Sequence, residues 1–225
     1  MQVDKTTILD IGLLDNNESI GLASHLDFCK TNGGKAKWMQ LITHPLDTKY
    51  AIESRQSALK IFLAEKVFLD QMKISNGTCL VIDQFYGNSF SPIPKQIGLL
   101  GAYWYQFWNK TDYALIAYSV HHLITFVQAL DQWLKVFEPY SNNTELNALI
   151  APIKKHITQL DCLRVDSKDL KKDPQAVLEL GYFFYYQYKA QLKNLQNHFY
   201  VVDAYYSMDT AIQEYGFNFQ EWVDQ

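Results

Sequence analysis

Apolar residues with a regular spacing in the middle of the chain constrain the fold more than any other feature. Within residues 97–137 they recur at alternating intervals of four and three positions. The residues that keep this rhythm are Ile116, Val120, Leu123, Val127, Leu130, Leu134 and Phe137. It is the a/d pattern of a long helix packed lengthwise against another helix. The pattern therefore predicts an all-α, mainly helical protein.

A second long helix is predicted over residues 175–215. The apolar positions along it are Leu180, Phe184, Tyr188, Leu192, Leu195, Phe199 and Val202. At a rise of about 1.5 Å per residue it would be on the order of 60 Å long, and it would need a partner of similar length. We expect the 97–137 helix to be that partner, antiparallel to the second helix, which Gly216 would end.

Three shorter helices are predicted near the front of the chain, where they would form a compact corner. Residues suited to N-cap positions favour three starting points. The caps are Ser19 for a helix over residues 20–29, Thr31 for the next helix, which stops at His44-Pro45, and Asp47 for a third over residues 48–72.

The remaining stretches complete the organisation. Residues 6–9 can form a short strand, residues 75–95 are expected to be an irregular connector, and Thr144 is placed to cap a helix that ends near Leu160. Three parts result. They are a corner with its connector (residues 1–95), the two long helices with a short helix and a tip loop (residues 96–215), and a tail (residues 216–225).

The composition is that of a globular protein, and the charge argues against strong DNA binding by this chain alone. Of its 225 residues 48% are hydrophobic, which is ample for a core, and the formal net charge of −4 gives no overall attraction for a polyanion. Three widely spaced cysteines favour a reduced, cytoplasmic protein without a zinc site. Residues 113–130 carry no formal charge, but their serine, threonine, histidine and glutamine residues argue against a membrane span.

The stretch from residue 22 to residue 56 has a distinctive order of residues. A Leu-Asp pair is followed by T-x-x-G, a basic segment with a tryptophan, His-Pro-Leu and I-x-x-R. The residues concerned are Leu22, Leu26, Asp27, Thr31, Gly34, Lys35, Lys37, Trp38, His44, Pro45, Leu46, Ile52, Arg55 and Gln56. This stretch resembles the start of the core domain of MutS-family DNA mismatch repair proteins.

The end of the second long helix carries a second part of the resemblance. Val202, Asp203, Ser207 and Met208 fit the L-D-x-x-x-S-L pattern with which the family's second lever helix ends. Residues 217–223 stand where the family has the segment that leads to its ATPase domain. Between these two ends only the predicted architecture is similar.

The resemblance implies a role for the chain as the core and lever region of a shortened MutS-like protein, cut before its ATPase domain. The family's levers carry ATP-driven movement to the end that holds DNA. The resemblance thus implies DNA as a partner of the full-length protein, a full-length homodimer, and ATP with Mg²⁺ as cofactors of the missing domain. In this chain we expect no cofactor, metal ligand or catalytic residue. Residues at the predicted arm tip, where the family contacts DNA, are Arg164, Lys168, Lys171 and Lys172.

Three features of the family are missing from this sequence. The closest match to a phosphate loop is Gly34-Lys35, which has Cys29 where the first glycine belongs and Ala36 where the hydroxyl belongs. The mismatch-reading F-x-E occurs only as Phe219-Gln220-Glu221, at the wrong end of the chain. Residues 162–175 are too few to form the β-rich clamp.

Several local patterns allow two interpretations. His121-His122 could bind a metal, but we prefer a solvated or interface pair because neighbouring helical residues point about 100° apart. The aromatic run at residues 182–188 could stack on bases, but we prefer packing or an oligomer surface. The basic clusters at residues 154–156 and 164–172 could bind phosphates, but aspartates interleave the second, so we prefer a solvated loop.

Two other functions remain open from the sequence. The chain could be a helical scaffold that dimerises through its aromatic long helix and has no DNA role. It could also be an enzyme with an unrecognised site, for which a polar pocket would be required.

Overall fold

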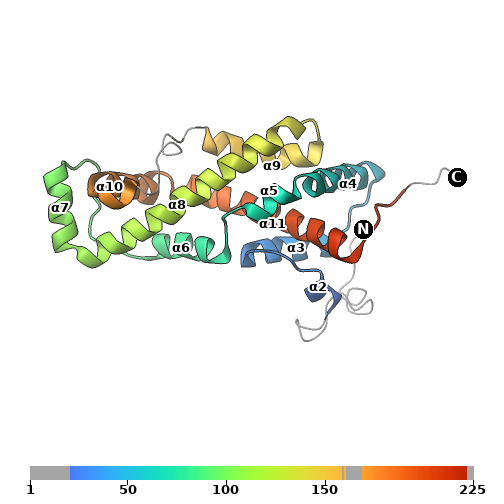
Figure 1. Ribbon diagram of the computed structural model, residues 1–225, viewed down its shortest axis with the longest axis horizontal. Helices are drawn as coiled ribbons and strands as arrows, with labels where there is room; N and C mark the ends of the chain where they lie inside the picture. The colour runs from blue at the N-terminus through green and yellow to red at the C-terminus, as the bar shows by residue number, and fades with distance from the viewer. Residues whose placement is uncertain (1–20, 159, 161–168, 222–225) are drawn as a thin grey trace. The chain divides into compact units, whose positions relative to one another are not determined.

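The computed structural model describes residues 21–158, 160 and 169–221, and these residues are mostly helical (Figure 1). No strand occurs among them, so the predicted all-α fold is confirmed; the predicted strand at residues 6–9 lies outside the described residues. The α-helices are α2 (Leu22–His25), α3 (Asn32–Thr43), α4 (Lys49–Ala64), α5 (Lys66–Gln71), α6 (Asn76–Gly87), α7 (Leu99–Trp108), α8 (Lys110–Phe137), α9 (Thr144–Ile157), α10 (Pro174–Tyr182) and α11 (Lys189–Tyr215). Shorter segments are the 3₁₀ helices η1 (Glu138–Tyr140) and η3 (Asp169–Lys172) and the π-helical segment η4 (Phe183–Gln187).

The chain divides into two compact units, each built from separate stretches of sequence. The first unit comprises residues 1–71, 136–151 and 197–225, and the second comprises residues 72–135 and 152–196. Helices α8, α9 and α11 each contribute residues to both units. The units thus join stretches that are distant in sequence, whereas the predicted parts followed the order of the chain.

Helix ends follow the N-cap rule, with two changes of residue. The Thr31 hydroxyl accepts a hydrogen bond from Gly34 N–H at the start of α3, as predicted. Helix α4 is capped by Thr48 rather than Asp47. At α9 the side chain of Asn143, rather than Thr144, accepts a hydrogen bond, from Leu146 N–H. Each replacement is the direct neighbour of the predicted cap and carries an equivalent side-chain oxygen.

Two predicted helices are each broken into two. The predicted 48–72 helix ends at Ala64 and restarts at Lys66, and the 97–137 helix is interrupted at Asn109 between α7 and α8. The first predicted helix is reduced to the four residues of α2, whose N-cap is Gly21; its predicted cap, Ser19, lies outside the described residues. Neither Glu65 nor Asn109 is a proline or a glycine, the residues that disfavour a helix interior most strongly.

The predicted connector at residues 75–95 contains a helix, α6. Ser75 and Thr78 form a capping box at its start, in which each side chain meets the backbone N–H of the other. The buried positions Thr78, Cys79, Ile82 and Phe85 follow the helical period. The short apolar run in this stretch therefore belongs to a helix and not to a strand.

The second long helix is also interrupted. Residues 183–187 form a π-helical turn in which Tyr188 N–H donates to Phe183 O (3.0 Å), and α11 then continues to Tyr215. Gly216, at φ 64°, ends α11 as predicted, because a residue without a Cβ adopts the left-handed conformation at little cost.

The expected antiparallel pairing of the two long helices is wrong. In the second unit a Cβ on Gly181 would lie 2.6 Å from Ile116 and 3.8 Å from Val120. These residues belong to the first half of α8 and to α10, near the start of the second long stretch. An antiparallel pair would bring Gly181 close to the C-terminal end of α8 instead.

Each unit has its own apolar core. In the first unit Phe62 of α4 contacts the rings of Phe137 (5.0 Å between centroids) and Tyr205 (5.4 Å). In the second unit α10 packs against α7.

Within the described chain, residues Lys110–Tyr140 are long and apolar enough for a membrane span, with a mean hydropathy of 1.3. Half of that apolar window is buried in the protein, as in an ordinary core helix.

Candidate functional site

The front and the back of the chain meet in the first unit, around one carboxylate of α11. Lys30 N–H donates to Asp203 Oδ1 (2.9 Å), while the Thr31 N–H (2.9 Å) and hydroxyl (2.6 Å) both donate to Oδ2. Asp203 is 2% exposed and Thr31 is 3% exposed. We call Lys30, Thr31, Gly34, Asp203 and Ser207 the Asp203 junction.

Ser207 extends this junction by one helical turn. Its hydroxyl accepts a hydrogen bond from Phe28 N–H (2.8 Å) and donates to Leu26 O (3.3 Å). Because residues four apart lie on the same face of a helix, Asp203 and Ser207 together hold the whole segment between α2 and α3. This segment is irregular, and α11 satisfies backbone groups that it does not satisfy itself.

Gly34 allows α3 and α11 to approach each other closely. It is buried in the first turn of α3, and a Cβ at this position would overlap the Asp203 carboxylate. The Asp203 side chain cannot move away without losing its three hydrogen bonds. The glycine is therefore required by space and not by backbone conformation.

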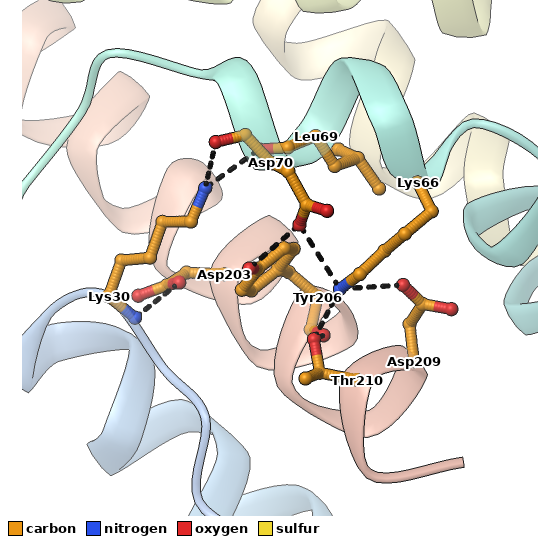
Figure 2. Close-up of polar contacts among 8 residues, drawn as sticks. All are labelled: Lys30, Lys66, Leu69, Asp70, Asp203, Tyr206, Asp209 and Thr210. Carbon is orange, nitrogen blue, oxygen red and sulfur yellow. Dashed lines mark hydrogen bonds and ion pairs between the residues drawn. The ribbon is translucent and has the colours of Figure 1, made fainter. Parts of the chain in front are cut away.

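A second polar group lies beside the neighbouring turn of α11. We call Lys66 and Asp70 of α5 and Asp209 and Thr210 of α11 the Lys66 cluster. Figure 2 shows the Lys66 ammonium between the carboxylates of Asp70 and Asp209, with Thr210 also in contact. The Nζ atom is 3.2 Å from Asp209 Oδ2 and 3.5 Å from Asp70 Oδ1. The Asp209 side chain is fully buried, and among the described residues neither of its oxygens has an aligned hydrogen-bond donor. Lys66 thus neutralises Asp209 by proximity and not by a well-formed hydrogen bond.

Tyr206 joins the two groups. The Lys66 ammonium lies 3.8 Å and the Lys30 ammonium 4.3 Å from the centre of its ring, both within the range of cation–π attraction. Its hydroxyl donates to Asp70 Oδ1 (3.0 Å), and Lys30 Nζ donates to Leu69 O (2.7 Å) (Figure 2). Helix α5, the segment before α3, and α11 are thereby connected through one aromatic ring.

The pKa values at this site are shifted by burial. Burial raises the pKa of Asp203 above its usual value, although hydrogen bonds from Thr31 and Lys30 oppose this. Burial also raises the pKa of Asp209, against the attraction of Lys66. Burial lowers the pKa of Lys30. Burial, together with the hydrogen bond to Asp70, raises the pKa of Tyr206 to about 12.

This arrangement is suited to holding segments together. Its oxygens and ammonium groups are directed at one another. Among the described residues, no three His, Cys, Asp or Glu side chains gather in a way that could hold a metal ion. The chemistry that the geometry supports is that of a buried polar anchor.

A second anchor lies nearby in the first unit. Arg55 of α4 donates hydrogen bonds from Nε and Nη2 to Glu145 Oε1 of α9, and each donor–acceptor distance is 3.0 Å. The buried Tyr205 hydroxyl of α11 donates to the same oxygen, and burial raises the pKa of this tyrosine. One carboxylate therefore ties α4, α9 and α11 together.

The residues that carry the family resemblance separate into two groups. Leu26 packs against the small core of Ala23, Trp38 and Ala204. The members with contacts in the structure include Leu26, Thr31, Gly34, Trp38, Arg55, Asp203 and Ser207. Leu22 and Pro45 are exposed and Leu46 is half-buried, and none of the three belongs to the junction.

Of the predicted DNA-contacting residues, only Lys172 has a side chain that the structure describes. Arg164 and Lys168 lie outside the described residues, and for Lys171 only the backbone, in η3, is described. Lys172 is exposed at the end of η3, directly before the Asp173 cap of α10. The cluster as a whole therefore stays a prediction.

The aromatic run at residues 182–188 is packed to a large extent. Phe184 and Tyr188 are buried, and the Tyr86 hydroxyl donates to Phe184 O (3.0 Å) within the π-helical turn. Tyr186 is half-exposed on a groove of about 760 Å³ beside Lys189 and Lys193. Lys193 pairs with Asp83 (3.6 Å), so that groove presents a partly neutralised surface.

Sequence reasoning missed the Lys66 cluster and Glu145. One signal was available for part of it: polar residues at positions 203, 206, 207 and 210 form a stripe at helical spacing along α11. Their partners could not be inferred in this way, because Lys66 and Thr210 are separated by 144 residues.

Three comparisons with known proteins place the chain in no family. No protein-family model matches the sequence, and neither a curated protein nor a solved structure gave a match.

Proposed function

We propose that this chain is the core and lever region of a MutS-like DNA-processing ATPase. The observation that carries the proposal is the contact between Thr31 and Asp203, which are 172 residues apart. The family resemblance rests on two short segments of the sequence, and these two segments bind each other through buried hydrogen bonds. This contact joins the two segments on which the resemblance rests, and it is what supports the proposal.

The junction would act as the base of a lever. Helix α11 has 27 residues, which corresponds to roughly 40 Å at about 1.5 Å per residue. A continuous helix carries a displacement from one end to the other, provided that one part of it is held firmly. Asp203, Ser207 and the Lys66 cluster would hold α11 at successive turns.

Arg55 supports the same reading from another helix. It belongs to the I-x-x-R part of the resemblance, and its two hydrogen bonds to one oxygen of Glu145 join α4 to α9. A planar guanidinium with two hydrogen bonds fixes orientation as well as distance. Movement reaching α11 would therefore be passed on to α4 and α9 as a unit.

The chemistry of such a protein would lie outside this chain. ATP and Mg²⁺ would bind to an ATPase domain after Gln225, DNA would be held by the full-length protein, and full-length subunits would form a homodimer. This chain would contribute no catalytic residue. Its own role would be mechanical coupling in the cytoplasm.

Two measurements test the proposal. The coding sequence after Gln225 should encode a G-x-x-x-x-G-K-S/T loop within roughly 100 residues. The full gene product should hydrolyse ATP faster when DNA is added, and Asp203→Asn should reduce that stimulation while leaving the basal rate unchanged. A coding sequence without the loop, or an ATPase indifferent to DNA, would contradict the proposal.

An interaction scaffold without a DNA role is the second candidate, and it is favoured by the exposed aromatic side chains of α7, among them Trp104, Phe107 and Trp108. It predicts self-association or partner binding that neither ATP nor DNA alters. Measuring association of the full gene product with and without both ligands separates the two functions.

A further inference from the structure

Helix α7 of the second unit exposes its more apolar face. The exposed positions recur in pairs four residues apart, which places them on one side of the helix. They are Leu99, Leu100, Tyr103, Trp104, Phe107 and Trp108. The opposite side, which meets the protein, consists of smaller or more polar residues: Gly101, Ala102, Tyr105 and Gln106. An ordinary surface helix has the reverse arrangement.

The exposed surface is large for a protein of this size. Tyr103, Trp104, Phe107 and Trp108 are 51–75% exposed. With about 200 Å² per aromatic side chain, they leave on the order of 500 Å² of aromatic surface in solvent. Leu99 and Leu100 bring this face towards the roughly 800 Å² per partner that a standard dimer interface buries. Contiguous apolar patches of this extent mark interaction sites.

The aromatic side chains are already ordered against one another. The rings of Trp104 and Trp108 are stacked with centroids 6.1 Å apart, and Phe107 meets Trp108 edge-on at 5.6 Å. With Tyr103 they line a shallow depression of about 310 Å³. Leu100, 81% exposed, protrudes beside it. The face therefore offers both a hollow and a projection, as a self-complementary surface requires.

We propose that a second copy of this chain binds at the α7 face, with α7 packed against α7 of the partner. Residues 99–109 contain no charged side chain. Two copies can thus meet across a two-fold axis without like-charge repulsion, which normally opposes the contact of a surface with itself. This inference does not depend on the proposed function, because it uses only the second unit's own surface.

The absence of charge also argues against other occupants. Nucleic acid would need lysines or arginines among the stacking rings. A membrane surface is bound by helices that carry Lys or Arg along their polar side, whereas α7 has Gln106 on that side and Asn109 as its C-cap. An apolar, uncharged partner surface is the best match, and α7 itself is such a surface.

Sedimentation velocity of the 225-residue chain over a range of concentrations tests the proposal. We expect a monomer–dimer equilibrium that Phe107→Glu and Leu100→Glu each weaken by at least about 100-fold, since two carboxylates would face each other in a buried centre. Val67→Glu is the matched control. Val67 is 74% exposed and Phe107 75%, but Val67 lies on α5 of the first unit, so its substitution should leave the dimer intact.

Circular dichroism verifies that each variant remains folded, which is expected because both α7 side chains are exposed. A wild-type chain that stays monomeric at high concentration would overturn the proposal, as would a dimer insensitive to both α7 substitutions. Co-sedimentation of a monomeric chain with neutral or anionic lipid vesicles would overturn it in favour of a membrane surface.

Discussion

At the Asp203 junction a carboxylate is buried and accepts three hydrogen bonds from protein, whereas on α7 six large apolar side chains face solvent. The junction buries the group that water solvates best, and α7 exposes the groups that water solvates worst. The junction is acceptable because its polar atoms have partners within the chain. The α7 face has no such compensation among the described residues.

The difference separates two uses of helical surface. A satisfied polar site inside a unit fixes one arrangement of segments, and its loss should appear as a loss of folding stability. An uncompensated apolar face contributes little to the fold, and its loss should appear in association. Substitutions at the two places should therefore affect different measurements.

The largest effect is expected from Gly34→Ala at the junction. The added methyl group would overlap the Asp203 carboxylate and force it away from Thr31 and Lys30. Overpacking combined with the loss of buried hydrogen bonds should lower the free energy of unfolding by about 4 kcal/mol, as measured by urea denaturation.

Gly87→Ala is the matched control for this experiment. Gly87 is the last residue of α6, and a Cβ there would meet nothing within 4 Å. The same chemical change should leave stability unchanged or raise it by up to about 1 kcal/mol. Equal effects of the two substitutions would show that the junction is less tightly closed than described.

The second effect in size concerns the hydrogen bonds of the junction. Asp203→Ala leaves the N–H groups of Lys30 and Thr31 buried without an acceptor, which should cost about 3 kcal/mol of unfolding free energy. Ser207→Ala removes a weaker pair of contacts and should cost about 1 kcal/mol. If Ser207→Ala were the more damaging, the anchor would lie at the other end of the segment.

Some features of the fold follow from the sequence, and others do not. The all-α fold followed from the 116–137 heptads, and the Thr31 cap and the Gly216 stop followed from local rules. The breaks at Glu65 and Asn109 could not be predicted, because neither residue interrupts a helix by itself. Asp203 was identified as part of a motif, but its partner Thr31 could not be inferred from spacing within one segment.

The α7 face shows the opposite case. The sequence shows directly that residues 99–109 contain no charged side chain. The side of the helix that is exposed depends on how Ala102 and Tyr105 pack. Only the three-dimensional structure shows this packing. From the sequence alone, this apolar run is predicted to be part of the 97–137 lever helix.

A third effect, of about 2 kcal/mol, is expected at the Lys66 cluster. Lys66→Met leaves the Asp209 carboxylate buried without its cation, which lowers stability at neutral pH. The double variant Lys66→Met, Asp209→Leu removes both charges and should recover most of the loss, because a well-packed apolar pair can replace a buried ion pair. Additive losses in this double-mutant cycle would mean that Lys66 acts mainly through Tyr206 and Asp70.

The smallest effect separates the two units by pH. In the first unit the pKa of Asp203 is raised above its usual value of 3.8, so its contribution to stability is complete below that pH and is lost as pH rises through the folded-state pKa. In the second unit burial lowers the pKa values of His122 and His156 below 6.5. Their contributions are complete above pH 6.5 and are lost as pH falls through the folded-state pKa values.

Thermal unfolding followed between pH 4 and pH 8 checks both signs. With increasing pH, the melting temperature should rise up to pH 6.5, and His122→Gln should flatten this rise. Asp203→Asn should leave the rise intact but remove the decline in melting temperature that begins as pH increases above 3.8. Both changes should be small, since His122 is only partly buried. If His122→Gln left the rise below pH 6.5 unchanged, the lowered pKa of His122 would not contribute to stability, and the pH dependence would not distinguish the two units.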